Sequence, residues 1–452
     1  MISNPLKKLT QIKHSRPHSK VKSLFNFTSR LSAMTLMSLC LGPGVLPAIA
    51  KSEQARSADS FVDSIGVNVH LTYNGSAYEK YEEIIKPKLK ELGIRHIRDG
   101  GFYDDTYFRK LKELASLGIK STLQFSGTPT GEVIGIAKIL EGAIVAIEGP
   151  NEPDLEWLSN FSYNGKKFPE GVIEYQKHLY AAVKGDPDTK HLPVLMPSMG
   201  WGKAAERVGS LEDHGDYGNM HSYPNLGQRP TYDIDSWFIP YGKLMAGSKP
   251  LMATEAGYHN LISHEIGVSE TAATRYIPRE LLEHFNRNIK RTFLYEFIDQ
   301  AADPQKSEKE LHYGLLRHDG SAKPSFKIIK NLITLLKDPG GDFSLGSLDF
   351  ELTGDMTEIH HTLLQKRNGT FFLIVWQDAK CWDNDKDKDI AVPERKLTLT
   401  LNTKITEVAA LKPIFDSTTK TPIWKKTSAS GQRIKQLAIS VPDHPLVLRL
   451  KP

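Results

Sequence analysis

The chain has 452 residues, of which 39% are hydrophobic and 25% are charged, a balance typical of a folded globular protein and not of a disordered or fibrous one. Its formal net charge of +5 is misleading, because residues 1–50 contain seven Lys/Arg and no acidic residue. Without them the balance is 51 Lys/Arg against 53 Asp/Glu, or −2. Residues 51–452 therefore lack the concentrated positive charge that nucleic-acid binding requires, so we expect no nucleic-acid partner.

The first 50 residues have the pattern of a signal peptide. A basic region extends to Arg30, an apolar region follows from Leu31, and Ala48-Ile49-Ala50 forms a small-x-small cleavage site. Gly and Pro interrupt the apolar region, which disfavours a membrane-spanning helix of about 20 residues, although an uncleaved anchor stays an alternative. We expect a secreted or periplasmic protein with no membrane span after cleavage. Only Cys381 would remain, so no internal disulfide could form.

From residue 64 one pattern recurs over eight short apolar runs: each run ends in polar residues, and segments with helical periodicity lie between most of them. The predicted strands are 64–71, 95–99, 120–125, 143–149, 193–198, 218–223, 251–256 and 292–298. The predicted helices are 77–92, 106–117, 131–141, 171–184, 233–246, 269–289 and 325–337. This alternation predicts a parallel (β/α)₈ (TIM) barrel over residues 60–340. An open doubly wound sheet is the alternative, but no G-x-G-x-x-G follows any strand.

The pattern changes after residue 341. Residues 342–452 contain short alternating runs such as 371–376, 397–401 and 446–450, separated by polar turns. These runs predict a smaller C-terminal β-sandwich domain. We expect it to bury one flank of the barrel, with a carbohydrate-binding module as the alternative.

Two of the predicted barrel strands end at a carboxylate. Glu152 follows the fourth strand, and Glu255 lies at the end of the seventh. Active sites of this fold lie at the carboxyl ends of the strands. The 103 residues that separate the two glutamates correspond to three βα units, so the side chains can face each other across the barrel mouth. Opposed carboxylates suit glycosidic cleavage, in which one group protonates the leaving oxygen and the other attacks or stabilises an oxocarbenium-like centre.

Asn151-Glu152-Pro153 after strand four, together with Glu255 on strand seven, resembles the clan A glycoside hydrolases, which are retaining enzymes on a (β/α)₈ barrel. The likeness covers residues 60–450, includes the turn at 314–324, and is greatest to family 39 and family 5-like members with a C-terminal β-domain. It implies Glu152 as the acid/base, Glu255 as the nucleophile and Asn151 as a partner of the sugar 2-hydroxyl. It implies no cofactor and no metal.

The resemblance extends to three further positions. Arg98, at the end of strand two, matches the clan's arginine, whose fixed charge keeps the nucleophile ionised. His221 and Tyr223 point to one face at the end of strand six, where Tyr223 would support the nucleophile. The alternative for Arg98 is a structural ion pair. The alternative for His221 and Tyr223 is ordinary packing at the rim of the barrel.

Other polar residues near the strand ends are expected to contact the substrate. Asn68 and His70 share one face of strand one and are expected to line the sugar site. Strand eight carries Tyr295 where the clan often has a tryptophan platform, so the sugar specificity of no single family can be transferred. Glu148, at the end of strand four, is interpreted as a supporting residue.

The sequence therefore predicts an exported retaining glycoside hydrolase that acts on an oligo- or polysaccharide by double displacement. A transglycosylase would use the same residues with a different acceptor. A catalytically silent glycan-binding barrel is the other alternative, although it would not need both glutamates. The sequence His264-Glu265 begins like a zinc-binding H-E-x-x-H motif, but Val268 stands where the second histidine is required.

Overall fold

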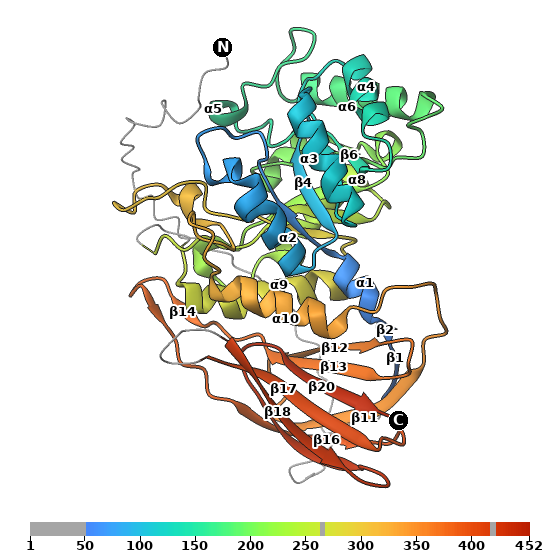
Figure 1. Ribbon diagram of the computed structural model, residues 1–452, viewed down its shortest axis with the longest axis vertical. Coiled ribbons are helices and arrows are strands. Elements are labelled where there is room, and N and C mark those ends of the chain that lie inside the picture. Colours follow the sequence, from blue (N-terminus) through green and yellow to red (C-terminus); the bar gives the residue numbers. More distant parts are fainter. Residues whose placement is uncertain (1–50, 263–266, 416–421) are drawn as a thin grey trace, which may run out of the picture. The chain divides into compact units, whose positions relative to one another are not determined.

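The computed structural model describes residues 51–262, 267–415 and 422–452 (Figure 1). The predicted signal peptide and the His264-Glu265 pair lie outside these ranges. In the part of the chain that is described, no helix combines the length and the apolar character needed to cross a membrane.

Eight parallel strands form a nearly closed barrel. Their order in the sheet is β7-β6-β5-β4-β3-β10-β9-β8, and a parallel bridge between Leu195 and Tyr217 joins β7 to the chain just before β8. The predicted fold class is therefore confirmed. The strands are β3 Ile65–Asn68, β4 His96–Gly100, β5 Lys120–Gln124, β6 Ile144–Glu148, β7 Val194–Leu195, β8 Gly218–Ser222, β9 Leu251–Ala256 and β10 Thr292–Leu294.

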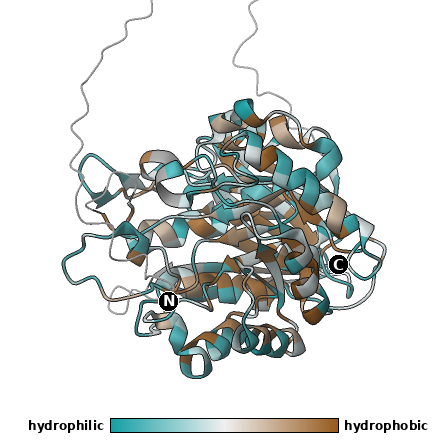
Figure 2. Ribbon diagram, turned by 90° about the horizontal axis from the view of Figure 1, so that it is seen from above, coloured by the Kyte–Doolittle hydropathy of each residue, from teal (hydrophilic) through white to brown (hydrophobic). Residues whose placement is uncertain are grey.

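Helices surround the barrel, and each buries one face against it. Helix α3 begins after Asp104, whose carboxylate accepts from the Tyr107 backbone N–H, and it buries Phe108, Leu111 and Leu114. In Figure 2 brown, hydrophobic ribbon gathers in the middle, while the helices at the edge are striped with teal. The principal helices are α2 Lys86–Leu92, α3 Asp105–Ser116, α4 Thr130–Ile139, α6 Glu170–Gly185, α8 Ile239–Ala246, α9 Glu270–Asn286 and α10 Pro324–Leu336.

The segment predicted as one helix over residues 77–92 is divided into three pieces. A 3-10 turn at Ala77–Glu79 and a π-helical turn at Tyr81–Ile85 precede α2. Pro87 lies in the first turn of α2 and has no N–H to donate to the preceding turn, which favours a break in the α-helical hydrogen bonding there. The prediction of a single helix was wrong.

Two sheets form the C-terminal β-sandwich, which was also predicted. One sheet has the order β1-β11-β16-β19 and the other β18-β17-β20-β13-β12-β2. Their facing sides enclose a core that includes Leu348, Leu373, Leu399 and Leu448. The strands are β1 Lys51–Gln54, β2 Arg56–Ser57, β11 Ser347–Gly354, β12 Ile359–Gln365, β13 Phe371–Gln377, β16 Arg395–Leu401, β17 Glu407–Phe415, β18 Pro422–Ser430, β19 Gln436–Val441 and β20 Leu446–Lys451.

Two strands of the sandwich precede the barrel in the chain. Strand β1 pairs antiparallel with β11, and β2 pairs parallel with β12. The sequence pattern does not indicate this contribution, because strands of four and two residues are too short to show alternation.

The sandwich packs on α9 and α10, and the contact contains a fully buried ion pair (Figure 1). Arg279 of α9 is 0% exposed and donates to Asp378 Oδ1 at 2.5 Å and to the carbonyl oxygen of Ala379. Nearby, the Trp376 indole donates to Glu283 Oε1 at 3.0 Å. The barrel and the sandwich therefore share hydrogen bonds as well as an apolar contact.

Asp378→Ala should destabilise both parts of the protein, because it leaves the buried Arg279 guanidinium without its counter-charge. A loss of roughly 3–5 kcal/mol is expected for such a broken pair. Urea unfolding followed by circular dichroism measures it, with exposed Asp355→Ala as the control that should leave the midpoint unchanged. An unchanged midpoint for Asp378→Ala would mean that the pair contributes no stability.

Candidate active site

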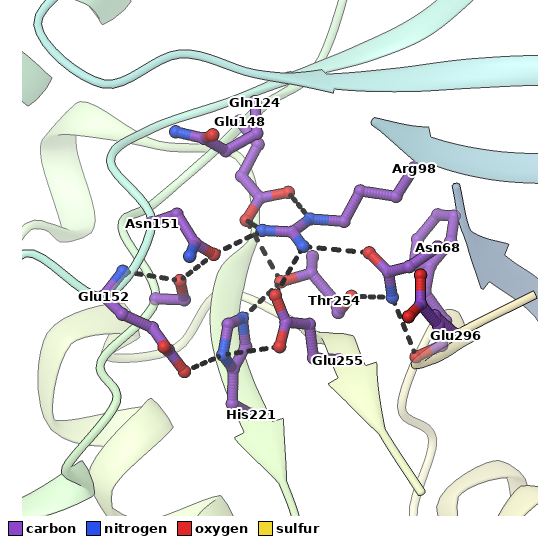
Figure 3. Close-up of polar contacts among 12 residues, drawn as sticks. Asn68, Arg98, Gln124, Glu148, Asn151, Glu152, His221, Thr254, Glu255 and Glu296 are labelled. Carbon is purple, nitrogen blue, oxygen red and sulfur yellow. Dashed lines mark hydrogen bonds and ion pairs between the residues drawn. The ribbon is translucent and has the colours of Figure 1, made fainter. Parts of the chain in front are cut away.

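Arg98 lies at the centre of a polar network at the carboxyl ends of the barrel strands (Figure 3). Its guanidinium forms two hydrogen bonds to Glu148, from Nε to Oε2 at 2.7 Å and from Nη2 to Oε1 at 2.8 Å. Nη1 donates to Glu255 Oε1 at 2.7 Å. Glu148 is 0% exposed, and the Arg98 side chain is 7% exposed. One buried cation is thus shared by two carboxylates, and Glu148 has the supporting position expected for it.

Two asparagines complete the contacts of Arg98. Nη1 donates to Asn68 Oδ1 at 2.9 Å, and Nη2 donates to Asn151 Oδ1 at 2.6 Å. Asn68 is 1% exposed, and its amide nitrogen donates to the Thr254 carbonyl oxygen at 3.0 Å. Both ends of the Asn68 amide are therefore bound within the protein, and this residue holds Arg98 in place. The oxygen of Asn151 is also bound, which leaves its amide nitrogen as the donor for a ligand.

An irregularity in β9 brings two adjacent side chains into the site. The register with β8 pairs Met220 with Ala253 but His221 with Glu255, so Thr254 is an extra residue. Thr254 Oγ1 lies 3.1 Å from His221 Nε2, and Glu255 also faces the interior. In a regular strand adjacent side chains point to opposite faces, and a bulge of this kind redirects one of them.

Glu152 lies just beyond β6 in an unusual backbone conformation. Its φ is +42°, in the left-handed region that non-glycine residues rarely adopt. The Glu152 N–H donates to Ser198 Oγ at 3.3 Å, and its carboxylate lies 2.6 Å from His221 Nδ1. Gly200 supports this position, because a Cβ there would lie 3.2 Å from the Glu152 carboxyl carbon and 2.4 Å from Leu155 Cδ1.

The surroundings of Glu255 favour its ionised form. Burial alone would raise the pKa of this carboxyl, but the charges of His221 and Arg98 and a 2.6 Å hydrogen bond from the Tyr223 hydroxyl outweigh it and hold the pKa below its ordinary value. The pKa of His221 moves the other way: burial lowers it, but the charge of Glu255 and the contact with Glu152 raise it above the ordinary value. His221 Nδ1 lies 2.6 Å from one carboxylate and 3.5 Å from the other.

Aromatic rings form the wall beside Glu255. His70 stacks on Tyr73 with ring centroids 4.4 Å apart and meets the edge of Tyr295 at 5.7 Å. Tyr295 in turn contacts Tyr223 at 6.4 Å and Tyr313 at 5.3 Å. Burial lowers the pKa of His70 to about 4, so the ring is neutral at neutral pH. The predicted residues His70 and Tyr295 thus belong to one aromatic wall.

The structure brings the predicted site residues together at one end of the barrel. Sequence reasoning missed Thr254, whose orientation depends on the bulge. It also missed Ser198, although a polar residue at the end of a predicted barrel strand is a weak sign of a site residue. It also missed Tyr73 and Tyr313, because both lie outside the strands and no periodicity marks them.

Glu152, His221 and Glu255 form a group in which one carboxylate oxygen or ring nitrogen of each residue lies within 4.8 Å of those of the other two. Three such ligands could hold a metal ion. However, Glu255 already accepts hydrogen bonds at both oxygens, and the fixed charge of Arg98 lies 2.7 Å away. The adjacent cation disfavours a metal ion at this position.

No family model matches the chain, and no curated protein matches its sequence. Among solved structures, a family 39 glycoside hydrolase from the gut symbiont Bacteroides cellulosilyticus WH2 matches with a TM-score of 0.56 at 16% identity, over 88% of this chain and 82% of that one. In fold, this chain resembles that enzyme. The endo-beta1,6-glucanase BT3312 matches with a TM-score of 0.49 at 12% identity, over 90% and 95% of the two chains. A GH5_18 structure from Streptomyces cattleya gives 0.45 at 15% identity, over 64% and 82%.

Glu255→Gln should lower the pKa of His221, because it removes the largest contribution that raises this pKa, while burial continues to lower it. Nitrogen-15 NMR of labelled histidines, with His221→Asn to identify the signal, measures the change. The control is Glu394→Gln, an exposed residue of the sandwich, which should leave the signal in place. A His221 signal that titrates identically in Glu255→Gln would contradict the electrostatic coupling.

Proposed function

We propose that this protein is a retaining glycoside hydrolase that cleaves O-glycosidic bonds of an oligo- or polysaccharide. The observation that carries the proposal is the separation of Glu152 and Glu255, whose nearest ligand oxygens lie within 4.8 Å of each other. Retaining enzymes have their two carboxyl groups about 5–5.5 Å apart, whereas inverting enzymes need roughly 6.5–9.5 Å to admit a water molecule. The short distance supports retention.

The two carboxyl groups have surroundings that suit different roles. Glu255 is supported by the Arg98 charge and the Tyr223 hydroxyl, which favour the ionised form that a nucleophile requires. Glu152 has no arginine beside it among the hydrogen bonds of the described residues, and its side chain is 15% exposed, toward the mouth. We therefore assign Glu255 as the nucleophile and Glu152 as the acid/base, as the resemblance to clan A implies.

In the first step Glu255 attacks the anomeric carbon, and the bond to the bridging oxygen breaks as that oxygen takes a proton from Glu152. The product is a glycosyl ester of Glu255. In the second step Glu152 accepts a proton from water, the water oxygen attacks the anomeric carbon, and Glu255 leaves as a carboxylate. His221, which lies against both carboxyl groups, holds them in position through these steps, and the Asn151 amide nitrogen is directed to a sugar hydroxyl.

Transglycosylation would follow the same first step and differ only in the acceptor, a sugar hydroxyl in place of water. Export is also part of the proposal. Its support is the pattern of residues 1–50.

Glu255→Ala should abolish turnover, because no other group can form the glycosyl ester. Glu152→Ala should lose roughly 10²–10⁴-fold on a natural glycan but little on an aryl glycoside with a good leaving group, which needs less protonation. Initial rates on both substrates measure the difference. Exposed Glu156→Ala, four residues along, is the matched control and should retain full activity. Equal losses for both variants on both substrates would refute the assignment of roles.

Tyr223→Phe should move the acidic limb of the kcat/KM profile to higher pH. The hydroxyl lowers the pKa of Glu255, so its removal raises that pKa, and the nucleophile is protonated at pH values where it was ionised before. The activity loss should be greatest at low pH and should diminish as pH rises. The ring contact with Tyr295 is retained in phenylalanine. An unmoved limb with uniformly reduced rates would mean that Tyr223 only positions the substrate.

A further inference from the structure

Exposed aromatic side chains gather at the catalytic end of the barrel. Among the described residues the aromatic side chains that are largely exposed are Tyr73 at 40%, Phe102 at 46%, Tyr103 at 63%, Tyr232 at 55% and Trp201 at 59%. Each follows the carboxyl end of a barrel strand: Tyr73 follows β3, Phe102 and Tyr103 follow β4, Trp201 follows β7, and Tyr232 follows β8. Aromatic rings in water are costly unless a ligand or partner covers them.

The strand order places two of these rings on opposite sides of the catalytic pair. Strands β3 and β7 are four apart in the eight-stranded barrel, so the loops that carry Tyr73 and Trp201 face each other across the mouth. Strand β6, which leads to Glu152, lies on one side of the line between them, and β9, which carries Glu255, lies on the other. A chain that runs from Tyr73 to Trp201 therefore passes between the two carboxyl groups.

Trp201 is fixed beside the acid/base. The Asp154 carboxylate accepts from the Gly200 N–H at 2.9 Å and from the Trp201 N–H at 2.8 Å, which ties the loop after β7 to the loop that carries Glu152. The indole packs edge-on against Trp237 with ring centroids 5.6 Å apart. The preceding residue, Gly200, lies against the Glu152 carboxyl group. The exposed ring is thus held rigidly on the side of the leaving group.

Tyr73 is fixed on the other side. Its ring stacks on His70 at 4.4 Å with an interplanar angle of 12°, and 40% of the residue stays exposed. Burial of its hydroxyl and the nearby charges of Asp99 and Glu296 raise its pKa to about 12, so the phenol is neutral. On the adjacent loop, Phe102 meets the edge of Tyr107 at 6.3 Å.

We propose that Trp201 and Tyr73 are sugar-binding platforms on the two sides of the scissile bond, so that the enzyme takes an internal stretch of an extended polysaccharide. The inference rests on the proposed glycosidase function and adds endo-type cleavage to it. Trp201 serves the leaving-group side, because Glu152 protonates the bridging oxygen next to it. The C–H face of a sugar ring is apolar and packs on an aromatic face. Each turnover breaks one internal bond, and water supplies a hydroxyl group to the new reducing end and a proton to the released chain.

The test compares a glycosyl fluoride with a polysaccharide. A fluoride leaving group is too small to reach Trp201, whereas a polymer covers it. On the polymer that the wild-type protein cleaves, Trp201→Ala should lose roughly tenfold in kcat/KM, and on the matching fluoride its rate should be unchanged. Trp201→Tyr, which keeps a ring, should recover most of the loss. Leu117→Ala is the matched control, since Leu117 is 42% exposed and follows α3 at the opposite end of the barrel.

The probes are α- and β-fluorides of glucose, galactose, mannose and xylose, with glucans, galactans, mannans and xylans, and product sizes are read by chromatography. The inference predicts oligosaccharides of intermediate length as early products. Three results would overturn this inference while the glycosidase function stands. They are cleavage of a fluoride without cleavage of any polymer, single sugars as the only early products, and an equal loss of rate for Trp201→Ala on both substrates. A wild-type protein that cleaves no probe would overturn both proposals.

Discussion

The site depends on one buried cation. Arg98 contacts two carboxylates and two amides, and the wholly buried Glu148 carboxylate, which also accepts from Asn219 and Thr254, binds it through two hydrogen bonds. A buried guanidinium is costly unless every donor is satisfied, and the planar fork of arginine suits this arrangement better than a lysine would. The bidentate pair with Glu148 fixes the plane of the guanidinium, and the remaining donors then fix the positions of Glu255 and Asn151.

The barrel makes this arrangement possible because its strands bring distant residues into register. Asn68 pairs with Arg98 across β3 and β4, and His221 pairs with Glu255 across β8 and β9. Rigid strands hold such groups more precisely than loops do. The exception is Glu152, which lies in a loop with positive φ. There no sheet holds the backbone; the Glu152 N–H donates to Ser198 Oγ, and the neighbouring Asp154 carboxylate accepts from the Gly200 N–H.

The sequence predicted much of this structure because apolar runs that end in polar residues are the direct signature of barrel strands. The positions of the eight strands and the residues at their ends followed from that pattern. The bulge at Thr254 could not be predicted, since it adds one residue to a strand without changing its hydrophobic composition. The supporting role of Asn68 was equally hidden, because alternation shows which face a residue occupies but not whether its amide is already bound.

Strands β1 and β2 tie the two ends of the described chain into one domain. Lys51 pairs with Phe350, and Arg56 pairs with Leu364, so the barrel is inserted within the sandwich in the order of the chain. During synthesis the first two strands emerge about 300 residues before their partners, so they stay unpaired while the barrel folds. Removal of the C-terminal segment at residue 342 would not yield a clean barrel, because it would leave two orphaned strands whose exposed edges could pair with other chains.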